Sequence, residues 1–313
     1  MTGVELTQST ARATGCISID VEDWFHILDS PAVPPIDAWA SMESRLQRNV
    51  ERLLTLLAET GTRATFFWLG WAAERHAELV RRCQATGHEI ASHGYGHVLA
   101  YEVGSDTFRQ DVHRAKALLE DVTGQRVRGF RAAGFGIRDR EPWAFDVIRE
   151  AGHDYDSSIF PGPRGHGGIS SARLGLHVIE TASGPLVECP MSAVELLSRR
   201  LSLFGGGYLR LAPRRLIRWG IKRLHAAGHP LIVYIHPREI DPEHPRLPLS
   251  LQRRFKSYVN LKSTMPKLDW LCRRHAFCTM SELVDTFLAS TDRRANDTCA
   301  SAPEPADPQE REA

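Results

Sequence analysis

The chain has 313 residues, and its 39 Lys and Arg residues nearly balance 38 Asp and Glu residues, which gives a net charge of +1 with histidine neutral. This balance argues against a general binder of nucleic acids or acidic membranes, because such proteins carry a basic excess. The hydrophobic content of 42% and the charged content of 25% are typical of a soluble globular protein and exclude disordered and membrane-spanning chains.

The first half of the chain alternates between short apolar strands and amphipathic helices. Residues 1–15 are small and polar, and we expect them to be flexible. The expected elements are then a strand at 16–20, a helix at 43–60, a strand at 64–69, a helix at 72–86 and a strand at 88–93. The helix at 43–60 rests on leucine and valine residues that recur at helical spacing, and Gly61 stands where a helix C-cap belongs.

The same alternation continues in the second half. The expected elements are a helix at 106–122, a strand at 127–131, a helix at 141–151, a strand at 154–158, a helix at 213–227 and a strand at 231–235. Residues 158–207 are rich in Gly and Pro, and we expect an irregular segment there with short strands near Val178 and Val187. Strands separated by helices of this length predict βαβ units, a largely parallel sheet and, with at least five units, a barrel.

The rest of the chain divides into a helical segment and a tail. Residues 242–289 extend the fold, and the capping pattern Thr279-x-x-Glu282 marks a last helix. Large apolar residues are almost absent from residues 290–313, so we predict a disordered tail there. The predicted organisation is a flexible N-terminus, one domain over residues 16–289 with its core at 16–241, and the tail.

Residues suited to chemistry stand at the ends of successive predicted strands. They are Asp20 with Glu22 and Asp23, His93 with His97, Arg131, Asp154 with Asp156, and His236. Each alone has an ordinary structural explanation, such as a helix cap or a turn. In an α/β barrel, however, the carboxyl ends of the strands share one face, and active sites are built there. Their joint recurrence therefore predicts one active site.

The segment His93-Gly-Tyr-Gly-His97 brings two imidazoles together in a glycine-containing turn. Two imidazoles and one carboxylate from residues 20–23 would form a metal-ligand set that leaves positions open for water and substrate. A second carboxylate of that cluster would be free to act as a base, because the metal keeps its own ligand ionised. The segment differs from the HExxH helix of metalloproteases, since Gly94 occupies the Glu position.

These motifs resemble those of the polysaccharide deacetylases with the NodB-homology domain, the fourth carbohydrate-esterase family. The resemblance covers residues 16–236 and rests on five motifs in the family's order. They are Ser18-Ile-Asp20-Val-Glu22-Asp23 in place of TFDDG, Ser92-His93-Gly-Tyr-Gly-His97, Phe130-Arg131-Ala-Ala-Gly-Phe135, Asp154-Tyr-Asp156-Ser-Ser158 and Tyr234-Ile-His236-Pro237.

A finer resemblance points to the branch found in exosortase (PEP-CTERM) exopolysaccharide loci. Its features here are an Asp-Val-Glu-Asp-Trp-Phe-His run at residues 20–26, a Gly-Gly-Gly-Tyr-x-Arg segment at 205–210 and an Ile-His-Pro-x-Glu-Ile-Asp run at 235–241. The C-terminal segment around residues 258–271 also resembles that branch.

The resemblance implies an α/β fold, a distorted barrel of seven or eight β/α units with a helical C-terminal extension, and metal-dependent N-deacetylation. His93 and His97 would bind the metal, most often Zn2+, together with Glu22 or its competitor Asp23. Asp20 would be the catalytic base and His236 the acid that protonates the leaving amine. Arg131 would orient Asp20 by an ion pair, with Asp154 or Asp156 near His236.

The expected substrate is an N-acetylhexosamine unit of an exopolysaccharide or of its precursor, which would release acetate. Trp24, His26 and Tyr208 are candidates for contacting the sugar ring, although packing in the core explains Trp24 equally well. Two alternatives remain open, namely a hydrolase of a small non-sugar amide and a non-catalytic carbohydrate-binding barrel.

The expected partner is an N-acetylated oligosaccharide or polysaccharide rather than a nucleic acid. Residues 1–15 lack the apolar core of a signal peptide, and no apolar run reaches the roughly 20 residues that span a bilayer. We therefore expect a cytoplasmic enzyme without a transmembrane segment, associated with a membrane-bound polysaccharide synthesis complex.

Overall fold

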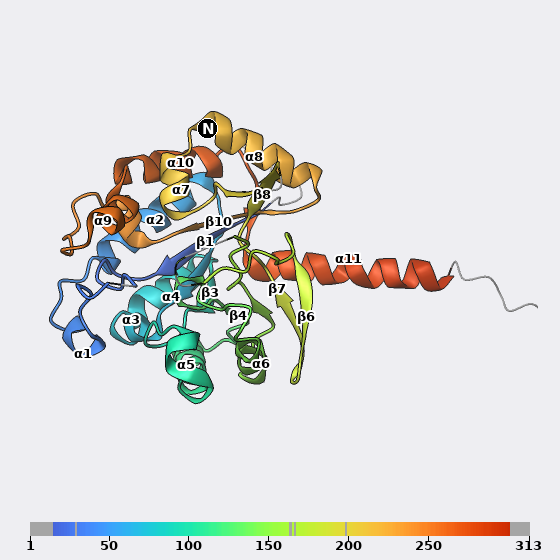
Figure 1. Ribbon diagram of the computed structural model, residues 1–313, viewed down its shortest axis with the longest axis horizontal. Coiled ribbons are helices and arrows are strands. Elements are labelled where there is room, and N and C mark those ends of the chain that lie inside the picture. Colours follow the sequence, from blue (N-terminus) through green and yellow to red (C-terminus); the bar gives the residue numbers. More distant parts are fainter. Residues whose placement is uncertain (1–14, 29, 163–164, 166, 198, 301–313) are drawn as a thin grey trace, which may run out of the picture.

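The computed structural model describes residues 15–28, 30–162, 165, 167–197 and 199–300, and the side chains of residues 292 and 294–300 are not described. One curled sheet forms the centre (Figure 1). Its strand order is β10 (Leu231–Ile235), β1 (Gly15–Val21), β2 (Thr65–Trp68), β3 (Glu89–Ser92), β4 (Gly129–Phe130), β5 (Tyr155–Asp156), β7 (Gly184–Glu188) and β6 (His177–Thr181). Neighbours from β10 to β7 pair in parallel, and β6 is antiparallel to β7. The expected α/β barrel is confirmed in a distorted, half-open form.

Three further pieces complete the strands. The short β11 (Phe277–Cys278) pairs with the start of β1, and β8 (Ala193–Leu196) pairs with β9 (Arg199–Ser202) in a separate ribbon. Gly205 forms a parallel bridge to Tyr234 on the free edge of β10, which continues the curl of the sheet beyond that strand.

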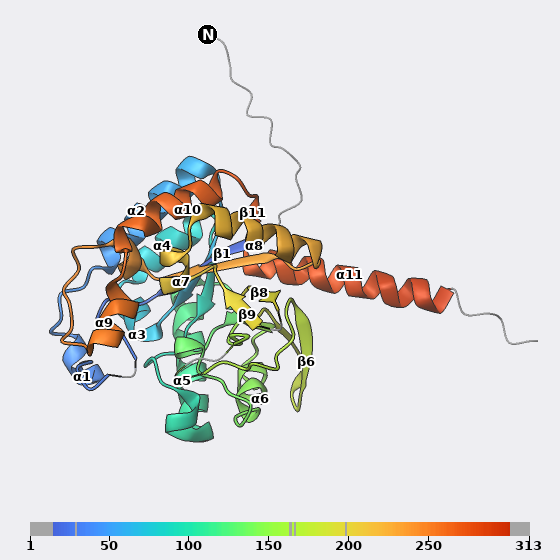
Figure 2. The same cartoon turned by 45° about the horizontal axis from the view of Figure 1, so that its top comes forward.

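Helices surround the sheet, as the two views in Figures 1 and 2 show. The helices of the first half are α1 (Ile36–Trp39), α2 (Leu46–Thr60), α3 (Gly70–Arg75), α4 (Ala77–Ala85), α5 (Ala100–Thr123) and α6 (Trp143–Glu150). Those of the second half are α7 (Gly206–Leu211), α8 (Arg214–Ala226), α9 (Leu251–Tyr258), α10 (Thr264–Cys272) and α11 (Met280–Ala300). Short 3-10 turns lie at Ala133–Phe135, Pro237–Ile240 and Leu261–Ser263.

Most predicted elements occur where the sequence places them, and the differences have local causes. The helix expected at 72–86 is divided at His76, whose backbone is not helical. The helix expected at 106–122 begins at Ala100 and bends at Gly104, which has a φ of 76°. The last helix continues to Ala300, past the boundary expected at residue 289, while residues 301–313 of the expected tail lie outside the described residues.

Alternation along the strands divides the side chains between two faces of the sheet, because successive residues of a strand point to opposite sides. In β1, Ile17 and Ile19 belong to the main hydrophobic core, which also contains the buried leucines of α2. Ser18 and Asp20 point to the interior of the curl, where both contact Arg131. The interior face therefore carries polar groups towards the carboxyl ends of the strands, and the outer face is apolar.

Gly205 provides a test of this architecture. A Cβ atom there would lie 1.9 Å from Cδ1 of the Tyr234 ring, a distance that real atoms do not reach. We expect Gly205→Ala to lower the free energy of unfolding by about 2–3 kcal/mol, as overpacking does in well-packed cores.

The matched control is Gly207→Ala in α7, where the nearest atom would be the Lys256 carbonyl oxygen at 3.3 Å. Alanine is favoured over glycine inside helices, so this variant should stay within about 1 kcal/mol of the parent. Denaturant unfolding of both variants measures the difference. Equal stabilities would contradict the close packing of Gly205 on Tyr234.

Candidate active site

Side chains from the ends of three strands, β1, β3 and β10, meet around one carboxylate oxygen. Glu22 Oε1 lies 3.0 Å from His93 Nε2, 2.9 Å from His97 Nε2 and 3.6 Å from His236 Nε2. Asp20 lies beside this group, with its Oδ2 3.9 Å from His236 Nε2. All five side chains are nearly buried, and His236 is the most accessible at 12%. A substrate therefore has to approach from the side of His236.

The loop that carries the two histidines is built around Asp111 of α5. The backbone N–H groups of Tyr95 and Gly96 each donate to the Asp111 carboxylate at 2.7 Å. His97 has a φ of 55°, which non-glycine residues seldom adopt, and such backbone strain is concentrated at functional sites. Gly94, with a φ of 73°, leaves room for the carboxylate, because a Cβ there would lie 2.6 Å from Asp111 Oδ2. The sequence gives no signal for Asp111, since it lies in the middle of the following helix.

The protonation of His93 tests whether this group fits a metal ion. Its Nδ1 lies 2.7 Å from the Arg131 carbonyl oxygen, which can only accept, so Nδ1 carries a proton. A neutral His93 then directs the Nε2 lone pair at a Glu22 oxygen, and two lone pairs at 3.0 Å repel each other. Either a second proton or a cation between them removes that repulsion. Two imidazole nitrogens and a carboxylate oxygen, with the far nitrogen of His93 held by a carbonyl, fit a divalent ion such as Zn2+.

The charges of this group agree with that fit. Burial by itself would raise the pKa of Glu22, but the neighbouring His97 and His236 and hydrogen bonds from His93 and His97 hold it well below its usual range. Burial likewise opposes charge on His93, yet Asp20 and Glu22 raise its pKa. The site therefore favours an ionised Glu22 carboxylate and positive charge at His93, a distribution that a bound cation would satisfy.

Arg131 holds the Asp20 carboxylate in place by an ion pair. Its Nη1 donates to Asp20 Oδ1 at 2.6 Å and to Ser18 Oγ at 3.0 Å. The other nitrogens donate to the carbonyl oxygen and hydroxyl of Ser157, and the guanidinium lies 4.1 Å from the centre of the Phe67 ring. A buried ion pair in which all three guanidinium nitrogens donate hydrogen bonds has a defined geometry. Asp20 Oδ1 is thus held by Arg131, and Oδ2 is left facing the site.

The partner of His236 is Glu239, which sequence reasoning missed. His236 Nδ1 lies 2.9 Å from Glu239 Oε1. Burial raises the pKa of Glu239, but the charge of Arg210 and the bond to His236 outweigh this and lower it to about 2. His236 is the N-cap of the 3-10 turn Pro237–Ile240, which contains Glu239, and positions three apart lie on the same side of such a turn. A Pro directly after the histidine and a Glu at the third position are the signal that could have identified the pair.

Three predicted acidic residues lie elsewhere. Asp23 is not part of the metal-ligand group, because its carboxylate accepts the backbone N–H groups of Trp24 and of Arg45 at the start of α2. Asp154 pairs with Arg126 and Arg128. Asp156 is fully buried but accepts from Ser158, and it lies beside Glu188 rather than His236. The expectation that Asp154 or Asp156 adjoins His236 is therefore corrected to Glu239.

Alternation explains the position of Asp156. Tyr155 packs in the interior cluster with Phe135 and Phe160, so the next residue must point to the opposite face of β5. Ser157 then returns to the interior, where it meets Arg131. Glu22 and Asp23 are also neighbours in the chain, and only Glu22 contacts the two histidines, whereas Asp23 points away from them.

The predicted sugar-contacting residues divide between core and surface. Trp24 is 5% exposed and its indole N–H donates to the Glu43 carbonyl oxygen, so it packs in the core. His26 is 1% exposed and lies among the rings of Phe25, Trp39 and Trp71. Neither can contact a sugar in this structure. Tyr208 is half exposed and stacks on Phe160, so it remains available.

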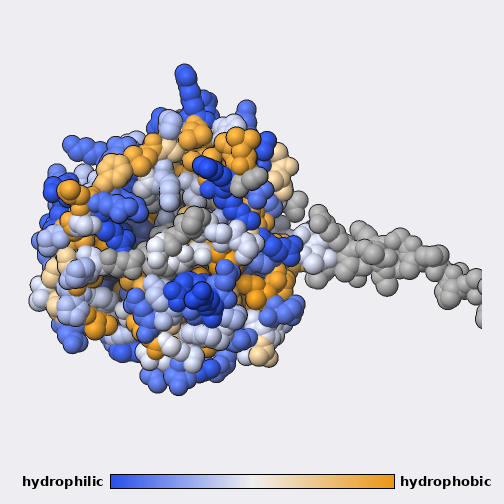
Figure 3. All heavy atoms as spheres, in the orientation of Figure 1, coloured by the Kyte–Doolittle hydropathy of each residue, from blue (hydrophilic) through white to orange (hydrophobic). Residues whose placement is uncertain are grey.

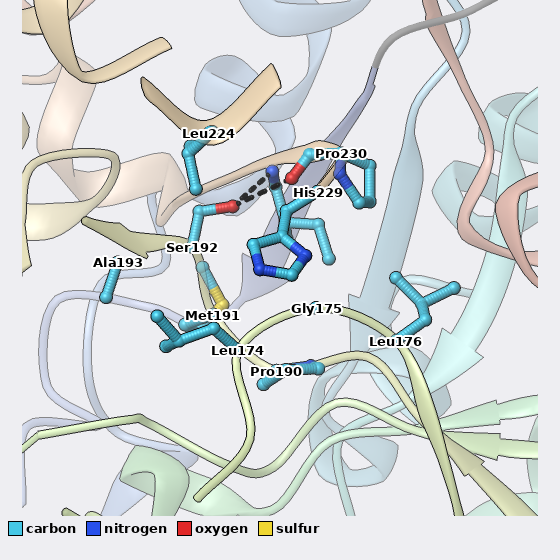
Figure 4. Close-up of a pocket in the computed structure, with 11 residues that line it drawn as sticks. Leu174, Gly175, Leu176, Pro190, Met191, Ser192, Ala193, Leu224, His229 and Pro230 are labelled. Carbon is cyan, nitrogen blue, oxygen red and sulfur yellow. Dashed lines mark hydrogen bonds between the residues drawn. The ribbon is translucent and has the colours of Figure 1, made fainter. Parts of the chain in front are cut away.

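A small pocket at the other end of β10 is separate from this group. It is lined mainly by apolar residues, with Ser192 and Ile232 joined by a hydrogen bond and Pro230 just before the strand (Figure 4). His236 follows the opposite end of the same strand. The pocket therefore does not contribute to the site.

Two family models match consecutive parts of the chain. Residues 37–155 match the model described as polysaccharide deacetylase, and residues 157–285 match a domain of unknown function, DUF3473. A peptidoglycan-N-acetylglucosamine deacetylase of Bacillus cereus is 32% identical over 94 residues, which are 30% of this chain and 34% of that protein. A chitooligosaccharide deacetylase of Sinorhizobium fredii is 35% identical over 97 residues, or 31% and 42% of the two chains. The chain thus spans less than half the length of these curated relatives.

Solved structures share the fold over almost the whole chain. A Mycobacterium smegmatis protein assigned to the polysaccharide deacetylases has a TM-score of 0.57 at 21% identity, covering 90% of this chain and 93% of the other. The structure of Puue allantoinase has a TM-score of 0.55 at 16% identity and covers 90% and 92%. At these identities the likeness concerns the fold alone. The family matches themselves show a polysaccharide deacetylase domain of the NodB-homology type at residues 37–155, followed by a DUF3473 segment at residues 157–285.

Proposed function

We propose that the protein is a metal-dependent N-deacetylase that removes acetate from N-acetylhexosamine units of an exopolysaccharide or its precursor. The observation that carries this proposal is the convergence of Glu22, His93 and His97 on one point, with Asp20 and His236 beside it. These residues would supply three ligands, a base and an acid, which are the groups that hydrolysis of an acetamide requires.

The chain's own residues would divide the reaction between a base and an acid that both lie beside Glu22. A divalent ion held by Glu22, His93 and His97 would polarise the acetyl oxygen and lower the pKa of a bound water. Asp20 Oδ2 faces the site, so it is positioned to take a proton from the attacking water, while Arg131 prevents the carboxylate from rotating. His236 Nε2 faces the same space and would deliver a proton to the leaving nitrogen. Glu239 holds the other ring nitrogen and thereby fixes the direction of Nε2.

Two other functions share parts of this site. A hydrolase of small non-sugar amides could use the same groups, and the resemblance to an allantoinase structure means that the fold does not distinguish the substrates. A non-catalytic carbohydrate-binding barrel would need neither a base nor an acid at this position. The partly exposed Tyr208 favours a sugar substrate, because aromatic rings at the rim of a site stack on sugars.

Acetate release from N-acetylated oligosaccharides, measured on the full chain loaded with Zn2+, tests the proposal. Activity on small cyclic amides measured in parallel distinguishes the first alternative, and a protein that holds no stoichiometric metal and releases nothing would support the second. We expect acetate release to disappear after treatment with a chelator and to return when the metal is added back. Acetate release that survives complete metal removal would contradict metal dependence.

Substitutions should distinguish the role of Asp20 as a base from the role of His93 as a metal ligand. We expect His93→Ala to lose bound metal and activity together, because it removes one of three ligands. Asp20→Asn should keep the metal but lower kcat by about 10²–10⁴-fold, the usual contribution of a general base. Elemental analysis of the purified variants and steady-state kinetics measure both effects. If Asp20→Asn loses its metal, the roles of Asp20 and Glu22 are exchanged.

Glu239 should act only through His236. We expect Glu239→Gln to lower kcat by about tenfold or more at unchanged metal content, because a neutral amide orients the ring less firmly. The same change should have little further effect in a His236→Ala background, since residues that act as a unit are not additive.

The matched control for Glu239 is Glu243→Gln, an exposed carboxylate four residues later in the chain. It should retain parental kinetics. Equal losses of kcat from Glu239→Gln with and without His236 would mean that Glu239 has a structural role only.

A further inference from the structure

The near-neutral total charge conceals a strongly uneven distribution. Residues 196–268 contain 15 Lys and Arg but 3 Asp and Glu, a net charge of +12 within a chain whose total is +1. Two of the three acidic residues, Glu239 and Asp241, are buried at 1% exposure. Glu239 bonds His236, and Asp241 accepts from Arg48 and Asn49. Two of the three acidic groups of this segment are thus turned inward, while most of its basic groups are exposed or partly exposed.

The basic groups gather on three helices. α7, α8 and α9 contain no acidic residue, and six of their exposed basic side chains form no ion pair with any residue in the described ranges. They are Arg215, Arg218, Lys222, Arg223, Arg254 and Lys256. Isolated cations on a surface without counter-charges create a positive field that extends about one Debye length into solution.

Large apolar side chains lie exposed among these cations. Leu251 is 85% and Phe255 is 57% exposed, and as residues four apart they share one side of α9. Tyr208 and Leu211 of α7 and Leu216 of α8 are also exposed. Single exposed apolar residues are ordinary, but five on adjoining elements form a patch of the kind that marks an interaction site.

The three helices form a continuous band beside the site. α7 contacts α9 through the Arg210 guanidinium, which donates to the carbonyl oxygens of Lys256 and Ser257, and α8 begins three residues after α7 ends. Figure 2 shows the band from α8 through α7 to α9, and Figure 3 shows blue and orange atoms side by side where Figure 1 places α8. Gly206 at the start of α7 adjoins the ring of Tyr234, two residues before His236. The band thus borders the approach to the site.

We propose that the exposed faces of α7, α8 and α9 dock on a membrane surface that contains anionic lipids. Basic residues attract anionic headgroups, and apolar residues between them enter the boundary between headgroups and acyl chains, as in interfacial helices. A soluble polyanion would account for the cations but not for Leu251 and Phe255 projecting between them. None of the helices in the described part of the chain combines the length and hydropathy needed to cross a membrane. This inference does not depend on the proposed deacetylation.

Sedimentation of the full chain with lipid vesicles tests the docking surface. We expect the chain to sediment with vesicles of phosphatidylcholine containing phosphatidylglycerol but not with phosphatidylcholine alone, and raised salt should weaken binding. Leu251→Ser with Phe255→Ser should weaken it at least tenfold, because the apolar contribution is lost. Arg254→Glu with Lys256→Glu, and separately Arg218→Glu with Lys222→Glu, should each weaken it by an order of magnitude, since each basic residue near the surface contributes on the order of fivefold.

Leu288→Ser with Arg293→Glu is the matched control, because both residues are exposed on α11, away from the band. This pair should bind vesicles as the parent does, and thermal unfolding should show that all variants are folded. Two outcomes overturn the proposal. One is no binding to anionic vesicles, or equal loss in the control pair. The other is binding that is unaffected by the apolar changes and fully competed by a soluble polyanion, which would indicate an anionic polymer as the ligand.

Discussion

Alternation of side chains along the parallel strands is the constraint on which the site depends. Because the strands run in parallel, their carboxyl ends share one edge of the sheet, and because side chains alternate, only every second residue at that edge faces the interior. Asp20, His93, Arg131 and His236 occupy interior positions at the carboxyl ends of buried strands. Asp23 and Asp156 stand one step out of phase and serve local hydrogen bonds instead. A difference of one residue thus separates a position in the candidate site from a structural one.

The candidate site draws on both matched segments and on Asp20 and Glu22, which precede them in the chain. The two histidines of the loop and Arg131 lie within the deacetylase match, while His236 and Glu239 lie within the DUF3473 match. Arg210 shows how the second segment supports the site. Its positive charge helps to keep Glu239 ionised, and its hydrogen bonds join α7 to α9. The DUF3473 segment therefore contributes His236 and Glu239 to the candidate site rather than forming a separate unit.

The sequence predicts the strands, their order along the chain and the residues at their ends, because burial and helical spacing are local signals. It also predicts the pairing of Asp20 with Arg131. It does not predict Asp111 or the orientation of Asp156, since the first depends on a contact between a loop and the middle of a helix. The orientation of Asp156 depends on where β5, a strand of only two residues, begins. Burial of Trp24 and His26 beneath the site likewise follows from tertiary packing and has no counterpart in the motif that contains them.

The net charge of the chain is a poor guide to the charge of its surface, just as the motif that contains Trp24 and His26 is a poor guide to sugar contact. In both cases the reason is that the sequence does not say which way a side chain points. A total of +1 excluded an acidic-membrane binder only on the assumption that the two signs are mixed evenly over the surface. In residues 196–268 only three acids stand against 15 basic residues, and two of the three are drawn inward, Glu239 to His236 and Asp241 to Arg48. Burying Glu239 for the site therefore also removes a negative charge from the exterior. The polarity of the surface is thus in part a consequence of how the active site is assembled.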